Sequence, residues 1–331
     1  MLRIKKILIP QKRIKLFYYL NCIGRELLPG KYFQNQLKSK LSSISQNETK
    51  YLLKRLNYYN KLKARSIPDY NFPRLKTYKI PPRHKVYYFD FIRYAKYFDE
   101  ELMANVLGLD VTHVPEVPTI VKSRPIGDKN ENSVLLKLNK IRHFNFVRYD
   151  IPYSTKKDTL IWRGIATQEN RQKFLKMYFD HPMCDIGDVN KHTANKAYVK
   201  DRISINKHLE SKFILTIEGN DVASNLKWVM SSNSVAISPK PLFETWFMEG
   251  ILIPDHHYIT IRDDFTDLEE KLNYYLKHPE KVQQIIKNAN EHVQQFKNKN
   301  REDLLSLLVL EKYFVQTGQM DPISQLQASI K

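Results

Sequence analysis

The residues best suited to chemistry lie in a polar turn that follows an apolar segment. Phe213–Ile217 has the pattern of a buried strand, the chain turns polar at Glu218–Asp221, and helical spacing of apolar residues begins at Val222. Gly219 lets the backbone turn tightly or approach a ligand closely. A helix starting here would offer free backbone N–H groups to an anion such as a pyrophosphate. An ordinary strand-to-helix connection has the same pattern.

The groups that could bind such an anion surround this turn. Asn220 or Asp221 can cap the helix through its side chain. The backbone N–H groups nearest the positive end of the helix dipole would then belong to Val222, Ala223 and Ser224.

Two arginines follow the preceding strand. Arg163 and Gly164 end an apolar strand, and Arg171 lies on the helix after it. A guanidinium at the carboxyl end of a strand can clamp a phosphate with two parallel hydrogen bonds. Arg163 could instead form a structural ion pair with Asp185 or Asp188.

A carboxylate follows the next strand after the polar turn, which is predicted at Ser234–Ile237. Glu244 lies near the start of Leu242–Glu249, which is predicted to be helical. Its carboxylate could accept hydrogen bonds from ribose hydroxyls, or it could simply favour the N-terminus of that helix.

Missing motifs exclude several other kinds of site. The sequence has no G-x-S-x-G, no G-x-x-x-x-G-K-[ST] and no G-x-G-x-x-G, and it holds only nine glycines. The pairs His181/Cys184 and His256/His257 lack the further ligands that a zinc site needs. No D-x-D triplet is present to hold a metal and a nucleotide sugar. A bound nucleotide would therefore be neutralised by arginine, lysine and backbone N–H groups.

Strands and helices alternate through the second half, which is typical of a parallel sheet covered on both faces. Strands are predicted at Thr159–Trp162, Met183–Ile186, Phe213–Ile217, Ser234–Ile237 and His257–Ile261. Helices are predicted at Gln168–Phe179, Val222–Met230, Leu242–Glu249, Leu268–Leu276 after a capping box at Thr266–Glu269, 279–298 and 301–316. Ligands of such sheets bind beyond the carboxyl ends of the strands.

The first half is less regular. Residues 1–66 have the pattern of a mainly helical, very basic region, and prolines interrupt residues 67–84. A strand at Lys85–Phe89, a helix at Phe91–Leu107 and a strand at Thr119–Val121 are predicted next.

Nearly all of the net charge of +19 lies in the first third. Residues 1–100 hold 23 Lys and Arg against six Asp and Glu, and aromatic residues alternate with the basic ones. Nucleic acid, an anionic membrane face or a phosphorylated acceptor would each suit such a surface. A basic surface that only keeps the protein soluble explains the pattern equally well.

The composition indicates a folded protein of about two domains. The hydrophobic fraction is 42% of 331 residues, and no apolar run approaches the roughly 20 residues that a bilayer requires. The N-terminal apolar runs are too short and too interrupted for a signal peptide, so we expect a protein that is not exported by this route. The two cysteines, Cys22 and Cys184, fit a reducing compartment.

Taken in order, the motifs of the second half resemble glycosyltransferase family 90. The matching segments are Trp162-Arg163-Gly164 with Arg171, Lys212–Ser224, Lys227-Trp228, Glu244–Phe247, and Pro254 with His257-Tyr258. Within the family, the pattern is most similar to the bacterial lipopolysaccharide-core branch, which is related to eukaryotic protein O-glucosyltransferases and fungal capsule-associated proteins. The resemblance covers residues 85–300, approximately.

The resemblance implies an α/β fold of the GT-B-like kind, with two Rossmann-type domains facing a cleft and C-terminal helices packing back toward the first domain. It divides the chain into a basic helical region (1–66), an acceptor-side domain (67–155, with parts of 1–66), a nucleotide-sugar-binding domain (156–300) and a C-terminal helix and tail (301–331). It also implies a UDP-sugar donor, no metal, no other cofactor, and inversion at the anomeric carbon.

The resemblance assigns roles around the turn. Arg171 would contact the diphosphate, with Arg163 and Gly164 beside it, and the segment Gly219–Lys227 would lie along the nucleotide. Asn225 stands where the glucosyltransferase branch has a phosphate-binding arginine. Lys227, two residues later, could substitute for it.

The family's catalytic base is an aspartate of the first domain, and the matching residue is Asp110, which precedes Lys122–Pro125. In inverting transfer a carboxylate takes the proton of the acceptor hydroxyl as it attacks the anomeric carbon. Asp110 could also be a turn or cap residue.

These observations predict a cytoplasmic enzyme, peripheral on the inner membrane, that transfers a hexose from a UDP-sugar to a lipopolysaccharide-core or related glycan acceptor. The basic first third would hold it to the anionic membrane surface or to a phosphorylated acceptor. The alternative is a nucleic-acid-binding protein that uses the basic, aromatic first third. UDP would stabilise only the enzyme against heat.

Overall fold

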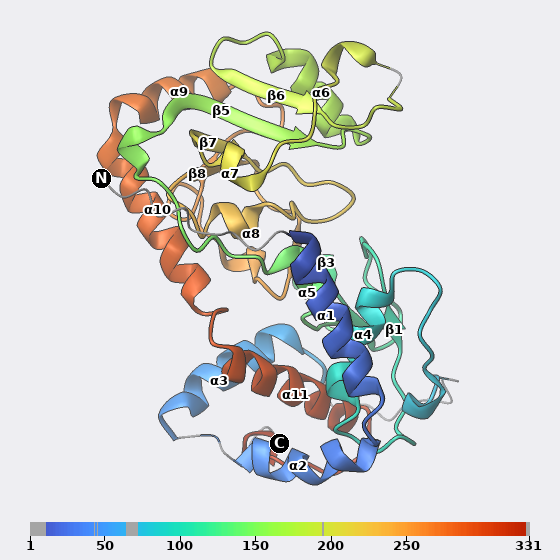
Figure 1. Ribbon diagram of the computed structural model, residues 1–331. Helices are drawn as coiled ribbons and strands as arrows, with labels where there is room; N and C mark the ends of the chain where they lie inside the picture. Colours follow the sequence, from blue (N-terminus) through green and yellow to red (C-terminus); the bar gives the residue numbers. More distant parts are fainter. Residues whose placement is uncertain (1–10, 43, 45, 64–71, 194, 329–331) are drawn as a thin grey trace, which may run out of the picture.

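The computed structural model describes residues 11–42, 44, 46–63, 72–193 and 195–328. It has two lobes (Figure 1): one holds a five-stranded sheet, and the other holds the N-terminal helices, a smaller sheet and the last long helix. The first ten residues, compared above with a signal peptide, and residues 64–66 of the predicted basic region lie outside the described residues. None of the described helices is both long and apolar enough to cross a membrane.

The basic region predicted at 1–66 is mainly helical in its described part, as its sequence predicts. Its helices are α1 (Gln11–Glu26), α2 (Gly30–Ser42) and α3 (Gln46–Tyr59), and after the short 3-10 helix η1 (Leu75–Thr77) comes α4 (Lys85–Ala95). The strand predicted at Lys85–Phe89 is therefore wrong, and the helix predicted to reach Leu107 ends at Ala95. Aromatic and β-branched residues suggested a strand, but Tyr87, Phe91 and Tyr94 recur with helical spacing and are buried.

The smaller sheet of this lobe has three short parallel strands in the order β1-β2-β4. They are β1 (Val106–Leu107), β2 (Thr119–Val121) and β4 (Ser133–Leu135), and they are followed by α5 (Lys140–His143) and η2 (Tyr153–Thr155). The predicted strand at Thr119–Val121 is confirmed.

The larger sheet confirms the parallel α/β pattern predicted for the second half. Its strands are β5 (Lys157–Gly164), β6 (Cys184–Asp188), β7 (Ser211–Leu215), β8 (Val235–Ser238) and β10 (Ile259–Thr260), all parallel, in the order β10-β8-β7-β5-β6. Strand β6 lies on one side of β5, and β7 lies on the other. The direction in which successive strands are added to the sheet therefore reverses between β5 and β7. In doubly wound sheets of this order, ligands bind at that switch point, outside the carboxyl ends of the two strands.

Helices cover this sheet on both faces. They are α6 (Glu169–Tyr178), α7 (Ile205–His208), α8 (Leu226–Val229), α9 (Leu268–Lys277) and α10 (Pro279–Gln294), with η3 (Lys196–Tyr198) before α7. Leu160 and Trp162 pack with Phe174 of α6, whereas Ile161 between them packs on the other face with Val229 of α8. Strands buried on both faces read as continuous apolar runs, which is why their sequences were recognisable. The predicted capping box does not form, because the Thr266 hydroxyl bonds to Asp264 instead.

The predicted helix at Leu242–Glu249 is wrong. The segment forms β9 (Phe243–Thr245), which pairs antiparallel with β3 (Ser123–Pro125), and then the short 3-10 helix η4 (Glu249–Ile251). Arg124 and Glu244 are register partners and form a buried ion pair at 2.7 Å. This pairing between distant segments overrides local helix propensity and joins the two lobes.

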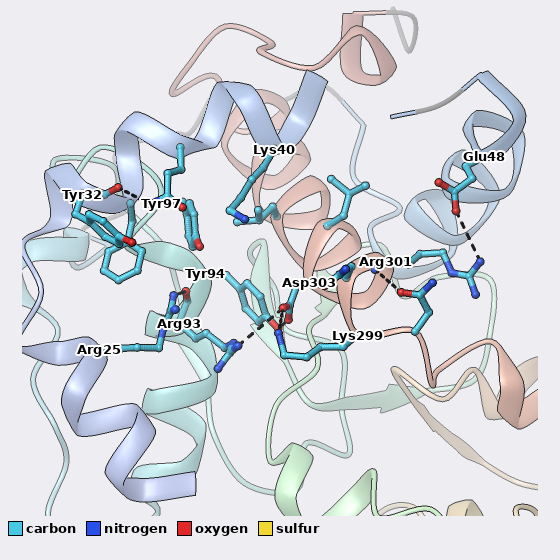
Figure 2. A pocket seen from close by; sticks show the side chains of 16 residues that line it. Arg25, Tyr32, Lys40, Glu48, Arg93, Tyr94, Tyr97, Lys299, Arg301 and Asp303 are labelled. Carbon is cyan, nitrogen blue, oxygen red and sulfur yellow. Dashed lines mark hydrogen bonds and ion pairs between the residues drawn. The ribbon is translucent and has the colours of Figure 1, made fainter. Parts of the chain in front are cut away.

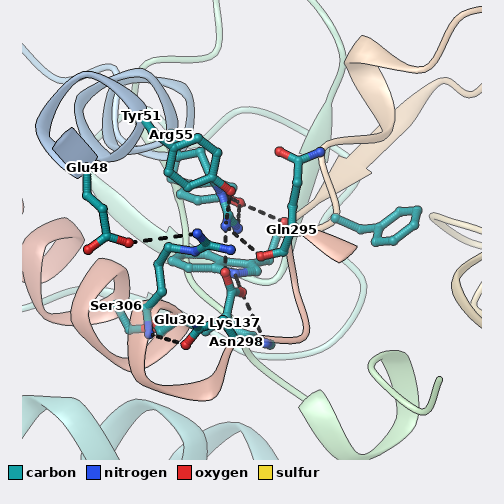
Figure 3. Close-up of polar contacts among 12 residues, drawn as sticks. Glu48, Tyr51, Arg55, Lys137, Gln295, Asn298, Glu302 and Ser306 are labelled. Atoms are coloured by element: carbon teal, nitrogen blue, oxygen red, sulfur yellow. Dashed lines mark hydrogen bonds and ion pairs between the residues drawn. The ribbon is translucent and has the colours of Figure 1, made fainter. Parts of the chain in front are cut away.

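The C-terminal part returns to the first lobe, as predicted, through α11 (Lys299–Gln316), which packs against α2, α3 and α4 and is followed by α12 (Gln325–Ala328). Its Glu302 carboxylate is buried and binds Arg55 of α3 at 2.6 Å, Lys137 at 3.1 Å and the Trp246 indole N–H at 2.6 Å (Figure 3). One buried carboxylate thus connects four distant segments of the chain.

Candidate active site

Arg171 joins the two loops at the switch point. It lies on α6 and donates from Nη1 to the backbone oxygen of Ile165 (2.8 Å), from Nη2 to that of Ile217 (2.9 Å) and from Nε to that of Glu218 (3.1 Å). Ile165 follows β5 and the other two residues follow β7, so one guanidinium spans both loops. Gly219 is needed beside it, because a Cβ there would lie 3.0 Å from Nη2.

The carboxylates of Asp188, Asp221 and Glu218 stabilise the charge of Arg171 only from a distance. Among the described residues it forms no ion pair within 4.0 Å, and its side chain is only partly accessible to solvent. Burial, followed by the positive charge of Arg142, lowers the pKa of Arg171 to about 10. A poorly hydrated cation without a counter-ion is costly, and an anion bound beside it would remove that cost.

The polar turn after β7 is irregular. The helix predicted from Val222 begins four residues later, at Leu226, because the Asn225 amide donates to the backbone oxygen of Leu215 (2.8 Å) and keeps the segment out of a helix. Within the described part of the chain, the backbone N–H groups of Val222, Ala223 and Ser224 have no recorded hydrogen-bond partner. They belong to a loop rather than to a helix N-terminus, and Val222 and Ala223 are buried whereas Ser224 is partly exposed.

Asp110, from the first lobe, lies directly against this turn. The Asn220 amide donates to its Oδ2 (3.2 Å), and Gln168 from the loop after β5 donates in turn to the Asn220 oxygen (2.7 Å). The Lys122 ammonium lies 2.5 Å from Asp110 Oδ1 and 2.6 Å from Asp221 Oδ2. Because the Lys122 side chain is only 2% exposed, it acts as a buried bridge between the two carboxylates.

Asp110 is ionised, partly exposed and preceded by a strained residue. Burial alone would raise the pKa of this carboxyl, but Lys122, Asn220 and Arg142 outweigh it and lower the pKa below the usual value, so the group is ionised at neutral pH. Its side chain is 30% exposed, which leaves it reachable by a substrate. Leu109 before it has φ = 74°, a left-handed conformation that branched residues rarely adopt. Such strained residues cluster at functional sites.

Two residues of α5 join the site without having been predicted. The Arg142 side chain is exposed, has no recorded hydrogen bond or ion pair among the described residues, and acts electrostatically on both Asp110 and Arg171. His143 is buried, and neither ring nitrogen has a partner within the described residues. Burial, then the charges of Lys227, Lys122 and Arg142, hold the pKa of His143 well below its usual range. The only sequence signal was the basic run at 140–143, which points to no particular partner.

The comparisons with known proteins fit this geometry. The family model for glycosyl transferase family 90 matches residues 137–313, more than half of the chain. The chain is also 39% identical over 305 residues to the O-glucosyltransferase LpsA of Dichelobacter nodosus. This aligned stretch covers 91% of this chain and 95% of that protein. The chain belongs to glycosyltransferase family 90. It is therefore a glycosyltransferase, with a sugar donor and a glycan acceptor as its general substrates.

In this family 90 enzyme Arg163, near the end of β5, and Arg171, on the helix after it, have different surroundings. Arg163 donates to the Asp185 carboxylate at 2.6 Å and to its backbone oxygen at 2.7 Å, which is the structural ion pair given above as the alternative. Gly164 is required by packing, because a Cβ there would lie 2.3 Å from the Trp162 ring. The structure thus brings Arg171 to the turn and leaves Arg163 bound to the neighbouring strand β6.

Two further predicted site residues of the transferase are buried in structural pairs. The Lys227 ammonium is fully buried against Glu249, so it does not reach the surface of the turn. Glu244 is 2% exposed and binds Arg124 and the Tyr58 hydroxyl. Its carboxylate is thus occupied within the protein, and it lies on a strand rather than at the start of a helix.

A third loop of the transferase is attached to the turn through Glu218. Its carboxylate accepts hydrogen bonds from the backbone N–H groups of Leu242 (3.2 Å) and Phe243 (3.2 Å), which follow β8. Burial raises the pKa of Glu218 to about 7, although these two N–H groups oppose the shift. Within the described chain, no group of three or more His, Cys, Asp and Glu residues could hold a metal ion.

Proposed function

We propose that this family 90 enzyme transfers a hexose from a UDP-sugar to a hydroxyl of a lipopolysaccharide-core or related glycan acceptor, without a metal and with inversion. The observation that carries the proposal is the contact between Asp110 and the turn that Arg171 holds open to an anion. A cation without a counter-ion and an ionised carboxylate meet at the switch point of a doubly wound sheet. Departure of a nucleoside diphosphate and deprotonation of a hydroxyl require such a pair of groups.

The donor would bind with its diphosphate beside Arg171. A guanidinium has five N–H groups, and three of those of Arg171 donate to backbone carbonyls, so the others can donate to phosphate oxygens. The N–H groups of Val222, Ala223 and Ser224 add donors that carry no charge, and Arg142 adds a second cation. The negative charge that develops on the departing UDP would be stabilised by these groups in place of a metal.

The acceptor hydroxyl would replace the Asn220 amide beside Asp110. The proton of the acceptor hydroxyl passes to a carboxylate oxygen of Asp110 as the hydroxyl oxygen forms a bond to the anomeric carbon. The bond from that carbon to the phosphate oxygen breaks, and UDP departs with the electron pair. Lys122 keeps Asp110 ionised before the reaction.

The GT-B-like arrangement and the domain limits belong to the same proposal. The donor would be bound by residues 156–300 and the acceptor by residues 67–155 with parts of 1–66, in a cytoplasmic enzyme held at the inner membrane by its basic first third. The name of the similar protein, an O-glucosyltransferase, supports glucose as the hexose and an oxygen as the acceptor atom.

The test is donor binding and turnover in the presence of EDTA. UDP should raise the thermal unfolding midpoint of the purified protein, and one of UDP-glucose, UDP-galactose and the UDP-N-acetylhexosamines should be hydrolysed slowly to UDP. No stabilisation by millimolar UDP would contradict the donor assignment. Activity that EDTA abolishes and a divalent cation restores would contradict the metal-independent mechanism.

A further inference from the structure

Helix α1 directs polar side chains toward the protein and apolar side chains toward solvent. On its inner side Tyr18 donates to the Asp90 carboxylate (2.8 Å), and Arg25 donates to the backbone oxygen of Arg93 (3.2 Å). Cys22 between them is buried and unpaired. All these contacts lead to α4 and fix the orientation of α1, so its outer face is set by specific bonds.

The outer face of α1 and the turn after it form an apolar ridge. It consists of Leu16, Phe17, Leu20 and Ile23 of the helix and Leu27, the residue that follows it, and their exposed fractions range from 48% to 81%. Positions 16, 20, 23 and 27 follow helical spacing and form one stripe. A helix of a globular protein normally turns such a stripe to the core, and a contiguous exposed apolar surface marks an interaction site. We refer to these five residues as the α1 ridge.

The charges around the α1 ridge are positive. Helix α1 contains no acidic residue before Glu26, and Glu26 itself is held by Lys96 (3.5 Å) and the Tyr88 hydroxyl (3.1 Å). Lys15 and Lys31 are exposed near the two ends of the ridge. The flanks of the ridge therefore favour a negatively charged partner.

The C-terminal end of the ridge meets a cationic cavity of about 680 Å³ (Figure 2). Basic residues in its lining outnumber acidic ones: the former are Arg25, Lys40, Arg93, Lys299 and Arg301, and the latter are Glu48 and Asp303. Asp303 pairs with Arg93 (3.8 Å) and Lys299 (2.5 Å), and Glu48 pairs with Arg301 (3.8 Å), so the two acidic residues of the lining are shared among a larger number of basic ones. Tyr32, exposed just beyond the ridge, lines the same cavity and makes the two surfaces continuous.

We propose that the α1 ridge inserts into the head-group region of an anionic phospholipid bilayer and that the adjoining cavity receives a phosphate-bearing head group. An apolar helix face flanked by lysines is the combination that binds in the plane of such a surface. A second copy of this chain is a poorer occupant, because it would bring two strongly basic surfaces together. The bilayer complements both the apolar character and the charge.

The placement of α1 gives this surface a purpose, and this step rests on the proposed function. The middle of α1 lies near α5, where the Lys140 ammonium is 5.5 Å from the centre of the Tyr18 ring, and α5 carries Arg142 (Figure 1). Arg25, about 10 Å further along the helix, lines the cavity. A bilayer against the ridge would therefore lie beside the catalytic residues, where a lipid-linked acceptor is presented.

Vesicle binding tests the surface without requiring sugar transfer. The full-length protein is sedimented with vesicles of phosphatidylcholine alone or with added phosphatidylglycerol, at low and high salt. Three variants are compared: the ridge variant Leu16→Gln/Leu20→Gln/Ile23→Gln, the cavity variant Lys299→Gln/Arg301→Gln, and the control Met177→Gln/Ile323→Gln, which changes exposed apolar residues elsewhere. Thermal unfolding with and without UDP shows that each variant is folded and whether it binds the donor.

We expect salt-sensitive binding to the phosphatidylglycerol vesicles, weakened about tenfold or more in the ridge variant and unchanged in the control. The cavity variant should bind these vesicles less well and lose part of the salt dependence. Glycerol phosphate as a soluble competitor should weaken binding of the wild type more than that of the cavity variant. Equal vesicle binding by the wild type and the ridge variant would overturn the proposal. So would a wild-type protein that is dimeric and does not bind vesicles, together with a monomeric ridge variant. A retained UDP response would show that such a failure leaves the proposed reaction untouched.

Discussion

Replacement of Arg171 by glutamine is the sharpest test of the site, because it removes both a charge and the link between two loops. The three hydrogen bonds from this charged group to backbone carbonyls are worth about 1.5–3 kcal/mol each, and glutamine can restore one of them. Glutamine carries no charge, so the substitution also removes the cost of burying the guanidinium, and this offsets part of the lost stability. We expect a net decrease of about 2 kcal/mol in the free energy of unfolding.

The functional effect of Arg171→Gln should be larger than its effect on stability. Loss of one group that stabilises a departing anion costs about 3 kcal/mol in the activation barrier, or roughly a hundredfold in rate. Arg163→Gln is the matched control, because it removes a nearby arginine, near the end of β5, whose guanidinium binds Asp185 and not the turn. Differential scanning fluorimetry with UDP and steady-state transfer measure both effects. The reasoning fails if Arg171→Gln keeps the UDP response or if Arg163→Gln loses it.

Three further changes test the remaining parts of the site and fold. Asp110→Asn should lower kcat by about 10²–10⁴-fold and leave UDP binding intact. Asp158, at the start of β5, is also paired with a lysine, and Asp158→Asn should change neither kcat nor UDP binding. A normal kcat for Asp110→Asn would exclude Asp110 as the base. Burial raises the pKa of Glu218 to about 7, so the carboxyl loses its negative charge, beside the proposed diphosphate position, as the pH falls below that value. Calorimetry should therefore find tighter UDP-glucose binding at about pH 6 than at about pH 8. Glu218→Gln should abolish this difference. Glu302→Ala should cost about 3–5 kcal/mol in urea unfolding, because it leaves two buried cations unpaired, and should cost more than Glu302→Gln.

The large sheet was predictable because its inner strands β5, β7 and β8 each carry a short buried apolar run. Phe213–Ile217 illustrates this: Phe213 and Leu215 pack on one face and Ile214 on the other, so the run is apolar without alternation. Helices α6 and α9–α11 also follow their predicted positions, because they are amphipathic or largely buried and uninterrupted. These elements are determined by local pattern and by burial.

The elements that were missed depend on partners far away in the sequence. Glu244 lies in a strand because Arg124, 120 residues earlier, pairs with it, and no local pattern reveals such a partner. The same limit separates Arg163 from Arg171, since both follow one strand and only the fold decides which of them reaches the turn. Arg142 was missed for this reason as well, because its importance comes from two residues outside its own segment.

Lys122 explains how the two halves of the site act together. A fully exposed lysine could lose either partner to solvent, but this ammonium is buried between Asp110 of the first lobe and Asp221 of the turn and needs both carboxylates. The position of the proposed proton acceptor, Asp110, is thus tied to the conformation of the loop proposed to bind the donor. Since Ser123 also donates to Asp221 (2.6 Å) and begins the strand that pairs with β9, the same contacts that join the lobes align the acceptor carboxylate with the turn. In the proposed reaction these buried contacts would hold Asp110 at a fixed position relative to the donor-binding turn, which is the condition that transfer between two bound substrates requires.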